Sequence, residues 1–225
     1  MIILENIVKT FTDGDKNLEI LKNISIKIET GKKVAIIGPS GSGKTTLLSI
    51  MSGLDKPSSG RVIIDGIDIH TLSENDMSVF RNKKISIIFQ SFELIQFFTA
   101  YENAMLPLSI RNSRNKEEVN QVLEKVGLTN RKHNMPSTLS GGEQQRVSIA
   151  RAVLAGSDII FADEPTGNLD SVNGKKVLEL LLEVVKKTNK TFVIITHDMN
   201  IARQMDIIYS MEDGILKKLI QENLI

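Results

Sequence analysis

The sequence lacks cysteine and has no excess of charge of either sign. Without cysteine it contains no disulfide and no thiolate metal site, which suits a reducing compartment. Its 28 Lys and Arg residues oppose 27 Asp and Glu residues, for a formal net charge of +1 over 225 residues. This balance gives no sequence-wide electrostatic footprint for nucleic acid, so we expect no nucleic-acid partner.

Long apolar runs are also missing. The longest runs, such as VAII and DIIFAD, fall far short of the roughly 18 residues that a membrane span needs. The N-terminus MIILENIVKTF carries Glu5 and lacks a basic region followed by an apolar one, so no signal peptide is evident. We therefore expect a soluble chain whose membrane role comes through a partner.

Strand patterns alternate with helix patterns along most of the chain. Near the N-terminus, ILENIV and LKNISIKI alternate as strands do, and KKVAIIG is typical of a buried parallel strand. The stretch NKEEVNQVLEKVGL instead shows helical spacing at Val119, Val122, Leu123 and Val126. The order of elements predicts an α/β fold with a mostly parallel sheet, interrupted by a helical insertion.

The stretch GPSGSGKT, Gly38 to Thr45, satisfies the pattern G-x-x-x-x-G-K-[ST] between a buried strand and a helix. Such a loop surrounds phosphates with backbone N–H groups, places Lys44 on the β and γ phosphates and offers the Thr45 hydroxyl to magnesium. The alternative is a Gly/Ser-rich turn at a strand-to-helix junction. The strand and helix on either side favour the phosphate loop.

Polar side chains end several apolar strands. Asp163 and Glu164 close IIFADE, where ligands bind beyond the carboxyl ends of strands in open α/β sheets. Asp163 is then a magnesium partner, and Glu164 orients or deprotonates a water molecule. His197 and Gln90 end VIITHD and ISIIFQ in the same way, although a lone histidine is more often structural.

The remaining histidines, His70 and His133, lie in polar stretches of the sequence. We predict that both are surface residues.

The stretch LSGGEQQR places two glycines at the start of a helix pattern. Ser140 and Glu143 fit a capping box, which leaves Gly141 and Gly142 unexplained. Glycine loses more backbone entropy on folding than any other residue, so the pair suggests that something approaches the backbone closely. A helix N-terminus attracts an anion.

Together these motifs resemble the ATP-binding cassette (ABC) ATPases, the nucleotide-binding subunits of membrane transporters, over essentially the whole chain. LSGGEQQR is similar to that family's signature sequence, with Glu143 where glutamine is commoner. The resemblance implies a P-loop core with an N-terminal antiparallel β subdomain. It divides the single domain 1–225 into a nucleotide-binding core with the β subdomain, 1–90 and 157–225, and a helical signature subdomain, 91–156.

The resemblance also implies ATP and Mg²⁺, an integral-membrane permease, and a place on the cytoplasmic face of the membrane through that permease. It implies a homodimer formed with ATP, in which each Ser140 to Gly142 segment closes over the other subunit's phosphate loop. The implied catalytic residues are Glu164, His197 and Gln90; the metal ligands are Thr45, Gln90 and Asp163; and the nucleotide-binding residues are Phe11, Gly38, Pro39, Ser40, Gly41, Ser42, Gly43, Lys44, Thr45, Thr46, Ser140, Gly141, Gly142, Glu143 and Asp170.

Within the family, EPTGNLDS looks like the compact ATPases of lipoprotein-release, macrolide-export and antimicrobial-peptide-resistance transporters. An ATPase that gates a non-transporting membrane partner, as in cell division, remains an alternative. Chromosome-associated members resemble the chain poorly, because they need a heptad-rich insertion that is missing between Lys44 and Ser140.

Two aromatic features each have two interpretations. Phe11 stands where the family usually stacks a tyrosine on adenine, and ordinary packing is the alternative. Four of the ten aromatic residues lie just after Gln90, at Phe92, Phe97, Phe98 and Tyr101. They form either helical core or a groove that receives a short permease helix.

Overall fold

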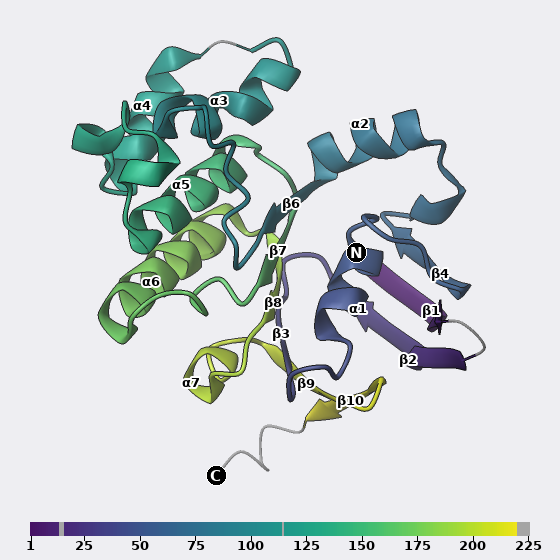
Figure 1. Cartoon of the computed structure of the whole chain (residues 1–225). Coiled ribbons are helices and arrows are strands. Elements are labelled where there is room, and N and C mark those ends of the chain that lie inside the picture. Colours follow the sequence, from purple (N-terminus) through teal and green to yellow (C-terminus); the bar gives the residue numbers. More distant parts are fainter. Residues whose placement is uncertain (14–15, 114, 220–225) are drawn as a thin grey trace. The chain divides into compact units, whose positions relative to one another are not determined.

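A computed structural model describes residues 1–13, 16–113 and 115–219 (Figure 1). It divides the chain into two compact units. The first comprises Met1–Arg81 and Lys190–Ile225, and the second comprises Asn82–Asn189. Helix α2 (Glu74–Lys84) begins in the first unit and ends in the second.

The first unit contains the N-terminal antiparallel sheet that the family resemblance implied. Its strands lie in the order β2-β1-β4-β5, with β1 paired antiparallel to both β2 and β4. On β1, Ile2, Leu4 and Ile7 are buried, so the apolar face of the strand lies in the core. The bounds are β1 (Ile2–Asp13), β2 (Lys16–Ile28), β4 (Ser59–Ile64) and β5 (Ile67–Asp68).

The same unit contains a set of buried parallel strands. Strand β3 (Lys33–Ile37) pairs in parallel with β8 (Thr191–Ile195) and with β9 (Ile207–Glu212), and β10 (Ile215–Leu219) closes the edge antiparallel to β9. Every residue of β8 is buried, as its apolar sequence predicts. Helix α1 (Lys44–Met51) follows β3, the short 3₁₀ helix η1 (Ile69–Thr71) follows β5, and α7 (Met199–Ala202) follows β8.

The second unit combines one parallel strand pair with helices (Figure 1). Strands β6 (Ile85–Ile88) and β7 (Ile159–Asp163) run parallel. The predicted apolar face of α4 is confirmed, since its valines and leucine lie in a core cluster with residues of α3 and α5. The helices are α3 (Ala100–Ile110), α4 (Lys116–Lys125), α5 (Gly141–Leu154) and α6 (Ser171–Thr188), with 3₁₀ turns η2 (Thr129–Arg131) and η3 (Pro136–Thr138).

The compact units differ from the subdomain boundaries expected from the sequence. The second unit includes β6, β7 and α6 in addition to the helical segment 91–156. The functional boundary at 91 and 156 therefore stays a prediction. In the described residues no helix is both long and apolar enough for a membrane span.

Candidate functional site

The phosphate-loop motif, called here the Walker A loop (Gly38–Thr45), connects β3 to α1 in the first unit. Three of its glycines have positive φ, at 154° for Gly38, 79° for Gly41 and 100° for Gly43. A Cβ at Gly38 would lie 2.1 Å from the Met211 carbonyl oxygen, and one at Gly43 would lie 3.0 Å from the Ile20 carbonyl oxygen. The chain's own backbone therefore requires glycine at both positions.

The polar groups of the Walker A loop fit a phosphate ligand. Lys44 is only 6% exposed, and its Nζ donates to the Gly38 and Pro39 carbonyl oxygens at 3.0 and 2.7 Å. The Ser42 hydroxyl is buried without a hydrogen-bond partner in the described part of the chain. Gly43, the N-cap of α1, provides no side-chain cap. An uncapped helix start, a buried ammonium group and an unpaired hydroxyl together suit an anion.

The last residue of this loop, Thr45, and two further predicted residues, Thr46 and His197, also belong to the first unit. Thr45 and Thr46 are in the first turn of α1. His197 follows β8, which pairs in parallel with β3 so that Ile195 lies opposite Ile36. Since Gly38 and His197 each come two residues after these partners, both emerge at the same carboxyl edge.

Phe11 lies on β1 and is 47% exposed, so it is not a core residue. The Lys9 ammonium lies 4.9 Å from the centre of its ring, within cation–π distance. Lys9 also forms an ion pair with Asp55 at 2.7 Å. These observations disfavour ordinary packing, and stacking of Phe11 on adenine stays a prediction.

The second unit contains the other strand-end residues. Strands β6 and β7 pair so that Ile88 lies opposite Ala162, and Gln90 and Glu164 each follow two residues later. Asp163 is the last residue of β7. Glu164 has a φ of 41°, a left-handed conformation that is uncommon outside glycine. The unit thus brings Gln90, Asp163 and Glu164 to one strand edge.

Asp170 caps helix α6. Its Oδ1 accepts hydrogen bonds from the backbone N–H groups of Val172 and Asn173 at 3.1 and 3.0 Å, and its Oδ2 accepts one from the Asn173 amide at 2.6 Å. These bonds, with the Asn173 backbone N–H foremost, lower the pKa of Asp170. Asp170 is therefore a carboxylate at neutral pH.

The predicted capping box is present at the signature helix start, the residues Ser140 to Glu143. The Glu143 N–H donates to Ser140 Oγ at 3.3 Å, and the Ser140 N–H donates to Glu143 Oε2 at 2.8 Å. The bond from the Ser140 backbone is the main cause that lowers the pKa of Glu143. Arg131 adds an ion pair to Glu143 at 3.1 Å.

The two signature glycines face their own chain. A Cβ at Gly142 would lie 3.4 Å from Cβ and Cγ of Asn173, and one at Gly141 would lie 3.4 Å from Leu169 Cδ2 and 3.6 Å from Phe92 Cζ. These are ordinary contact distances, and neither glycine has a positive φ. The chain therefore has room for alanine at both positions, and a larger side chain at 142 would meet Asn173.

Two polar residues of the second unit, Asn168 and Gln145, have contacts or burial that the sequence does not predict. Asn168 bonds Gln90 through both ends of its side chain. Gln145, on α5, is fully buried, and neither atom of its amide has a hydrogen-bond partner among the described residues. Asn168 lies two residues before the predicted Asp170 in GNLD, and this short separation was its only signal in the sequence. Gln145 had none, because it lies in the polar run EQQR.

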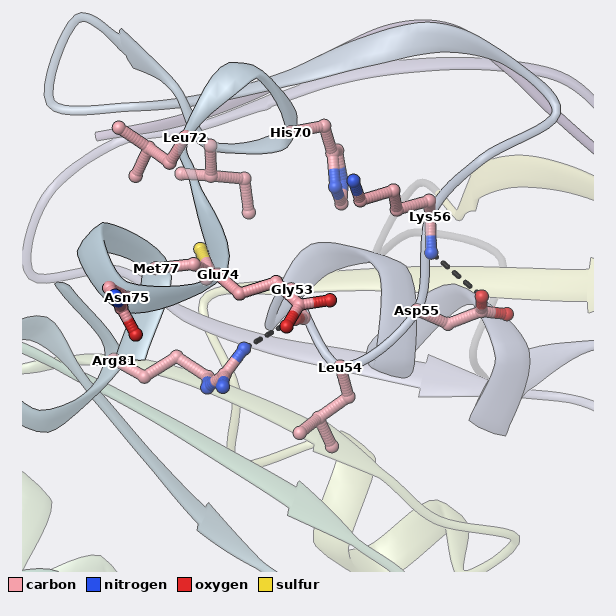
Figure 2. A pocket seen from close by; sticks show the side chains of 11 residues that line it. Gly53, Leu54, Asp55, Lys56, His70, Leu72, Glu74, Asn75, Met77 and Arg81 are labelled. Atoms are coloured by element: carbon pink, nitrogen blue, oxygen red, sulfur yellow. Dashed lines mark hydrogen bonds between the residues drawn. The ribbon is translucent and has the colours of Figure 1, made fainter. Parts of the chain in front are cut away.

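His133 is exposed, as predicted, but the prediction for His70 was wrong. His70 is half-buried at a cavity of about 400 Å³ in the first unit, and Figure 2 shows it above Lys56 and Asp55. Arg81 also lines this cavity, and its guanidinium donates to the Gly53 carbonyl oxygen at 2.8 Å. Burial lowers the pKa of His70, because the charged imidazolium loses hydration there. The cavity is lined by Gly53, Leu54, Asp55, Lys56, Ile69, His70, Leu72, Glu74, Asn75, Met77 and Arg81.

The core interpretation of the aromatic segment holds for two of its four rings, and the groove for a permease helix stays a prediction. Phe92 and Tyr101 pack against the core cluster of the helices. Phe97 is 74% exposed and meets Phe98 edge-on with ring centres 5.2 Å apart. Phe97 is therefore the exposed ring of the segment, whereas Phe92 and Tyr101 are half-buried against the cluster.

No group of three or more His, Cys, Asp or Glu side chains suited to a metal ion occurs in the described ranges. The magnesium ligands expected from the sequence are of a different kind, since Thr45 offers a hydroxyl, Gln90 an amide oxygen and Asp163 a single carboxylate. Mg²⁺ that is bound together with a nucleotide usually takes one or two protein ligands plus phosphate oxygens and water. The residue types present fit that mode.

Comparisons with known proteins agree with these motifs. Residues 21–167 match the family model described as ABC transporter. The lipoprotein-releasing system ATP-binding protein LolD of Treponema denticola is 42% identical over 97% of this chain and 98% of its own length. LolD of Francisella tularensis subsp. tularensis is 43% identical over 97% and 96%.

Two solved structures of the ABC transporter cassette MJ0796 superpose with a TM-score of 0.89 and cover 98% of this chain and 99% of their own. One, 41% identical, is described as a dimer, and the other, 40% identical, as a dimeric post-hydrolysis state bound to ADP and Pi. The family match covers more than half of the chain, and the relatives cover nearly all of it. The chain therefore belongs to the ABC transporter family, as an ATP-binding subunit that hydrolyses ATP with Mg²⁺.

Proposed function

We propose that this chain powers a transporter that releases or exports lipoproteins or similar lipid-bearing substrates, and that a permease holds it on the cytoplasmic face of the membrane. The observation that supports this most is the identity of 42 to 43% to LolD proteins over nearly the whole chain. The segment EPTGNLDS fits the same group.

The Walker A loop is the proposed cradle for the ATP phosphates. Lys44, now bonded to two carbonyl oxygens of its own loop, would exchange them for the β and γ phosphates. Ser42 would give its unpaired hydroxyl to a phosphate oxygen. Thr45, Asp163 and Gln90 would hold Mg²⁺, which neutralises charge on the phosphates.

Glu164 is the proposed base for the attacking water. It follows β7 directly, and its left-handed backbone turns the chain sharply after the strand. His197, at the edge of the parallel strands of the first unit, is the proposed switch histidine. The left-handed backbone of Glu164 is a strained position, and strained non-glycine positions cost on the order of 1–3 kcal/mol and cluster at functional sites.

Two substitutions distinguish the phosphate-binding role of Lys44 from the role of Glu164 as the base. Lys44→Ala should weaken ATP binding as well as hydrolysis, because the positive charge that contacts the phosphates is lost. Glu164→Gln should bind ATP normally and lose turnover by about a hundredfold or more, since it keeps the size and loses the base. Calorimetric titration with ATP and steady-state phosphate release measure both. Unchanged ATP affinity in Lys44→Ala, or near-normal turnover in Glu164→Gln, would refute the respective role.

The signature helix start is the proposed second half of a composite ATP site. Its capping box uses the N–H of Glu143, whereas the N–H groups of Gly141 and Gly142 have no intrahelical partner. The Walker A loop already has the helix start of α1 for its own nucleotide, so these donors have a phosphate to bind only on a second copy. A twofold dimer would contain two such sites. The dimeric state of the MJ0796 cassettes supports this arrangement.

Exposed Phe97 is the proposed contact for a permease helix, because an exposed aromatic ring suits an apolar anchor. Phe97→Ser should leave folding intact and weaken the stimulation of ATPase activity by the permease. Phe92→Ser is the matched variant, and it should lose stability because its ring packs against the core cluster. Equal stimulation of wild type and Phe97→Ser would exclude this contact.

Isolating the membrane protein that copurifies with this chain tests the transport function most directly. After reconstitution in vesicles that contain a lipid-modified protein, ATP-dependent release of that protein is the expected result. ATP hydrolysis that responds to the membrane partner without any release would instead favour the alternative, an ATPase that gates a non-transporting partner.

A further inference from the structure

We propose that Asn168 is a positioning residue for the reaction: it fastens Gln90 to the loop that carries Glu164 and Asp170, called here the 164–170 loop. This inference rests on the proposed roles of Gln90 and Glu164. It concerns contacts within the second unit only.

One asparagine side chain bonds both the side chain and the main chain of Gln90. The Gln90 Nε2 donates to Asn168 Oδ1 at 3.2 Å, and the Asn168 Nδ2 donates to the Gln90 carbonyl oxygen at 3.0 Å. If either amide turned over, a donor would face a donor or an acceptor an acceptor. The pair therefore fixes the direction of the Gln90 amide.

The residue before Asn168 makes room for this contact. A Cβ at Gly167 would lie 2.7 Å from Gln90 Nε2 and 3.1 Å from Gln90 Cδ. Gly167 does not have a positive φ, so its glycine serves the close approach and not an unusual backbone conformation. Two consecutive residues thus hold the Gln90 side chain: Gly167 leaves space for its amide, and Asn168 forms a hydrogen bond to it.

The 164–170 loop is braced by its own backbone. The Gly167 N–H donates to the Glu164 carbonyl oxygen at 2.9 Å, and the Leu169 N–H donates to the Thr166 carbonyl oxygen at 3.1 Å. Asp170 then caps α6. A displacement at Asn168 is therefore passed to Glu164 at one end of the loop and to Asp170 at the other.

The chain after Gln90 is fastened as well. The guanidinium of Arg151, on α5, donates to the carbonyl oxygens of Phe92 and Glu93 at 2.9 and 2.6 Å. Gln90 thus lies between two fastened segments, the 164–170 loop and the stretch that leads to the exposed Phe97. A partner that moves this stretch acts on Glu164 through Asn168.

The contrasting role is a purely structural one, in which Asn168 only stabilises a surface loop. The positioning role predicts that Asn168→Ala lowers kcat by about tenfold, because a small misplacement of a reacting group costs about that much or more. The KM for ATP should stay within about twofold, since binding depends chiefly on the Walker A loop. Asn168→Asp keeps the oxygen that accepts from Gln90 Nε2 and should recover part of the loss.

Asn115→Ala is the matched control. Asn115 is an exposed asparagine of the same unit whose side chain accepts from the Glu118 N–H at the start of α4. Its loss should lower the melting temperature and leave kcat unchanged. Asn168→Ala should instead lower kcat and leave the melting temperature nearly unchanged.

The decisive experiment is a double-mutant cycle of Gln90→Ala and Asn168→Ala, with Mg-ATP turnover, the KM for ATP and melting temperature measured for each protein. If Asn168 acts through Gln90, its substitution changes kcat little once Gln90 is already alanine. Equal losses in both backgrounds, an unchanged kcat in Asn168→Ala, or a melting-temperature loss that Asn168→Asp does not reverse would overturn the inference. A normal kcat in Gln90→Ala would instead refute the proposed role of Gln90 itself.

Discussion

The two glycine-rich helix starts, one in each unit, contain glycine for different reasons. At the Walker A loop the glycines have positive φ, and a Cβ at Gly38 would collide with the Met211 carbonyl oxygen. At the signature helix start, Gly141 and Gly142 lack positive φ, and their Cβ positions have ordinary contacts. The backbone of the chain itself therefore requires glycine in the Walker A loop. It does not require glycine at positions 141 and 142.

The N-terminal caps of α1 and α5 also differ. Helix α1 begins at Gly43 with no side-chain cap, so its N-terminal donors are left for a ligand of the same chain. Helix α5 has a full capping box from Ser140 and Glu143 and leaves only the donors at its two glycines. A helix start can thus bind a phosphate of its own subunit or present a few selected donors to another molecule.

The largest effect expected from this comparison is on folding. Gly38→Ala should lower the free energy of unfolding by about 3 kcal/mol or more, since it combines a backbone collision with an unfavourable φ. Gly142→Ala should be neutral or stabilising by up to about 1 kcal/mol, because alanine is the better helix former. Urea unfolding followed by circular dichroism measures both. Equal stability of the two variants would remove the contrast.

An intermediate effect is expected inside the signature helix. Gln145→Met should raise the free energy of unfolding by about 1–2 kcal/mol, because it fills the same space without an unpaired amide. Gln144→Met is the control, since the Gln144 amide donates to the Leu139 carbonyl oxygen at 3.2 Å and this bond would be lost. Destabilisation of Gln145→Met would show that the buried amide has a binding partner in solution.

The smallest effect concerns His70, which is half-buried at the cavity of the first unit. Burial places the folded-state pKa of His70 below its ordinary value of 6.5, so the unfolded chain takes up the proton first as the pH falls. This contribution to stability is present above pH 6.5 and declines below it. His70→Gln should therefore lose less stability than wild type between pH 7.5 and pH 5.5 in parallel urea titrations. Identical pH dependence would contradict the burial effect.

The sequence predicts the local features best. The Walker A loop and the capping box of Ser140 and Glu143 depend on residues within one short segment, and the structure contains both helix starts. The apolar face of α4 follows from its helical spacing for the same reason. The fold class follows from the alternation of strand and helix patterns along the chain.

Features that depend on distant contacts escape such reasoning. Asn168 and Gln90 are 78 positions apart, and no spacing rule connects them. Gln145 looks like one more exposed polar residue until α5 is packed. His70 is half-buried because η1 lies over the chain that follows α1, a contact that its polar sequence neighbours conceal.

Sedimentation of a matched pair of variants tests the central claim, that the N–H groups at the signature helix start bind the ATP of a second copy. Both Gly141→Ala and Gly141→Pro add a Cβ, but only proline removes the N–H, and proline is tolerated at the first helical position. The extended Ser140 backbone, with a ψ of 159°, also suits the residue before a proline. The difference between Gly141→Ala and Gly141→Pro therefore measures the contribution of the N–H group at position 141.

Both changes would be made in Glu164→Gln, which keeps ATP bound, and sedimentation velocity would be measured with Mg-ATP and with Mg-ADP. We predict dimers with ATP and monomers with ADP for Glu164→Gln and for its Gly141→Ala derivative. The Gly141→Pro derivative should remain mostly monomeric with ATP at unchanged ATP affinity and stability, since each lost bond to a charged acceptor costs about 1.5–3 kcal/mol and the dimer contains two. ATP-dependent dimers of the proline derivative as stable as those of the alanine derivative would contradict the claim.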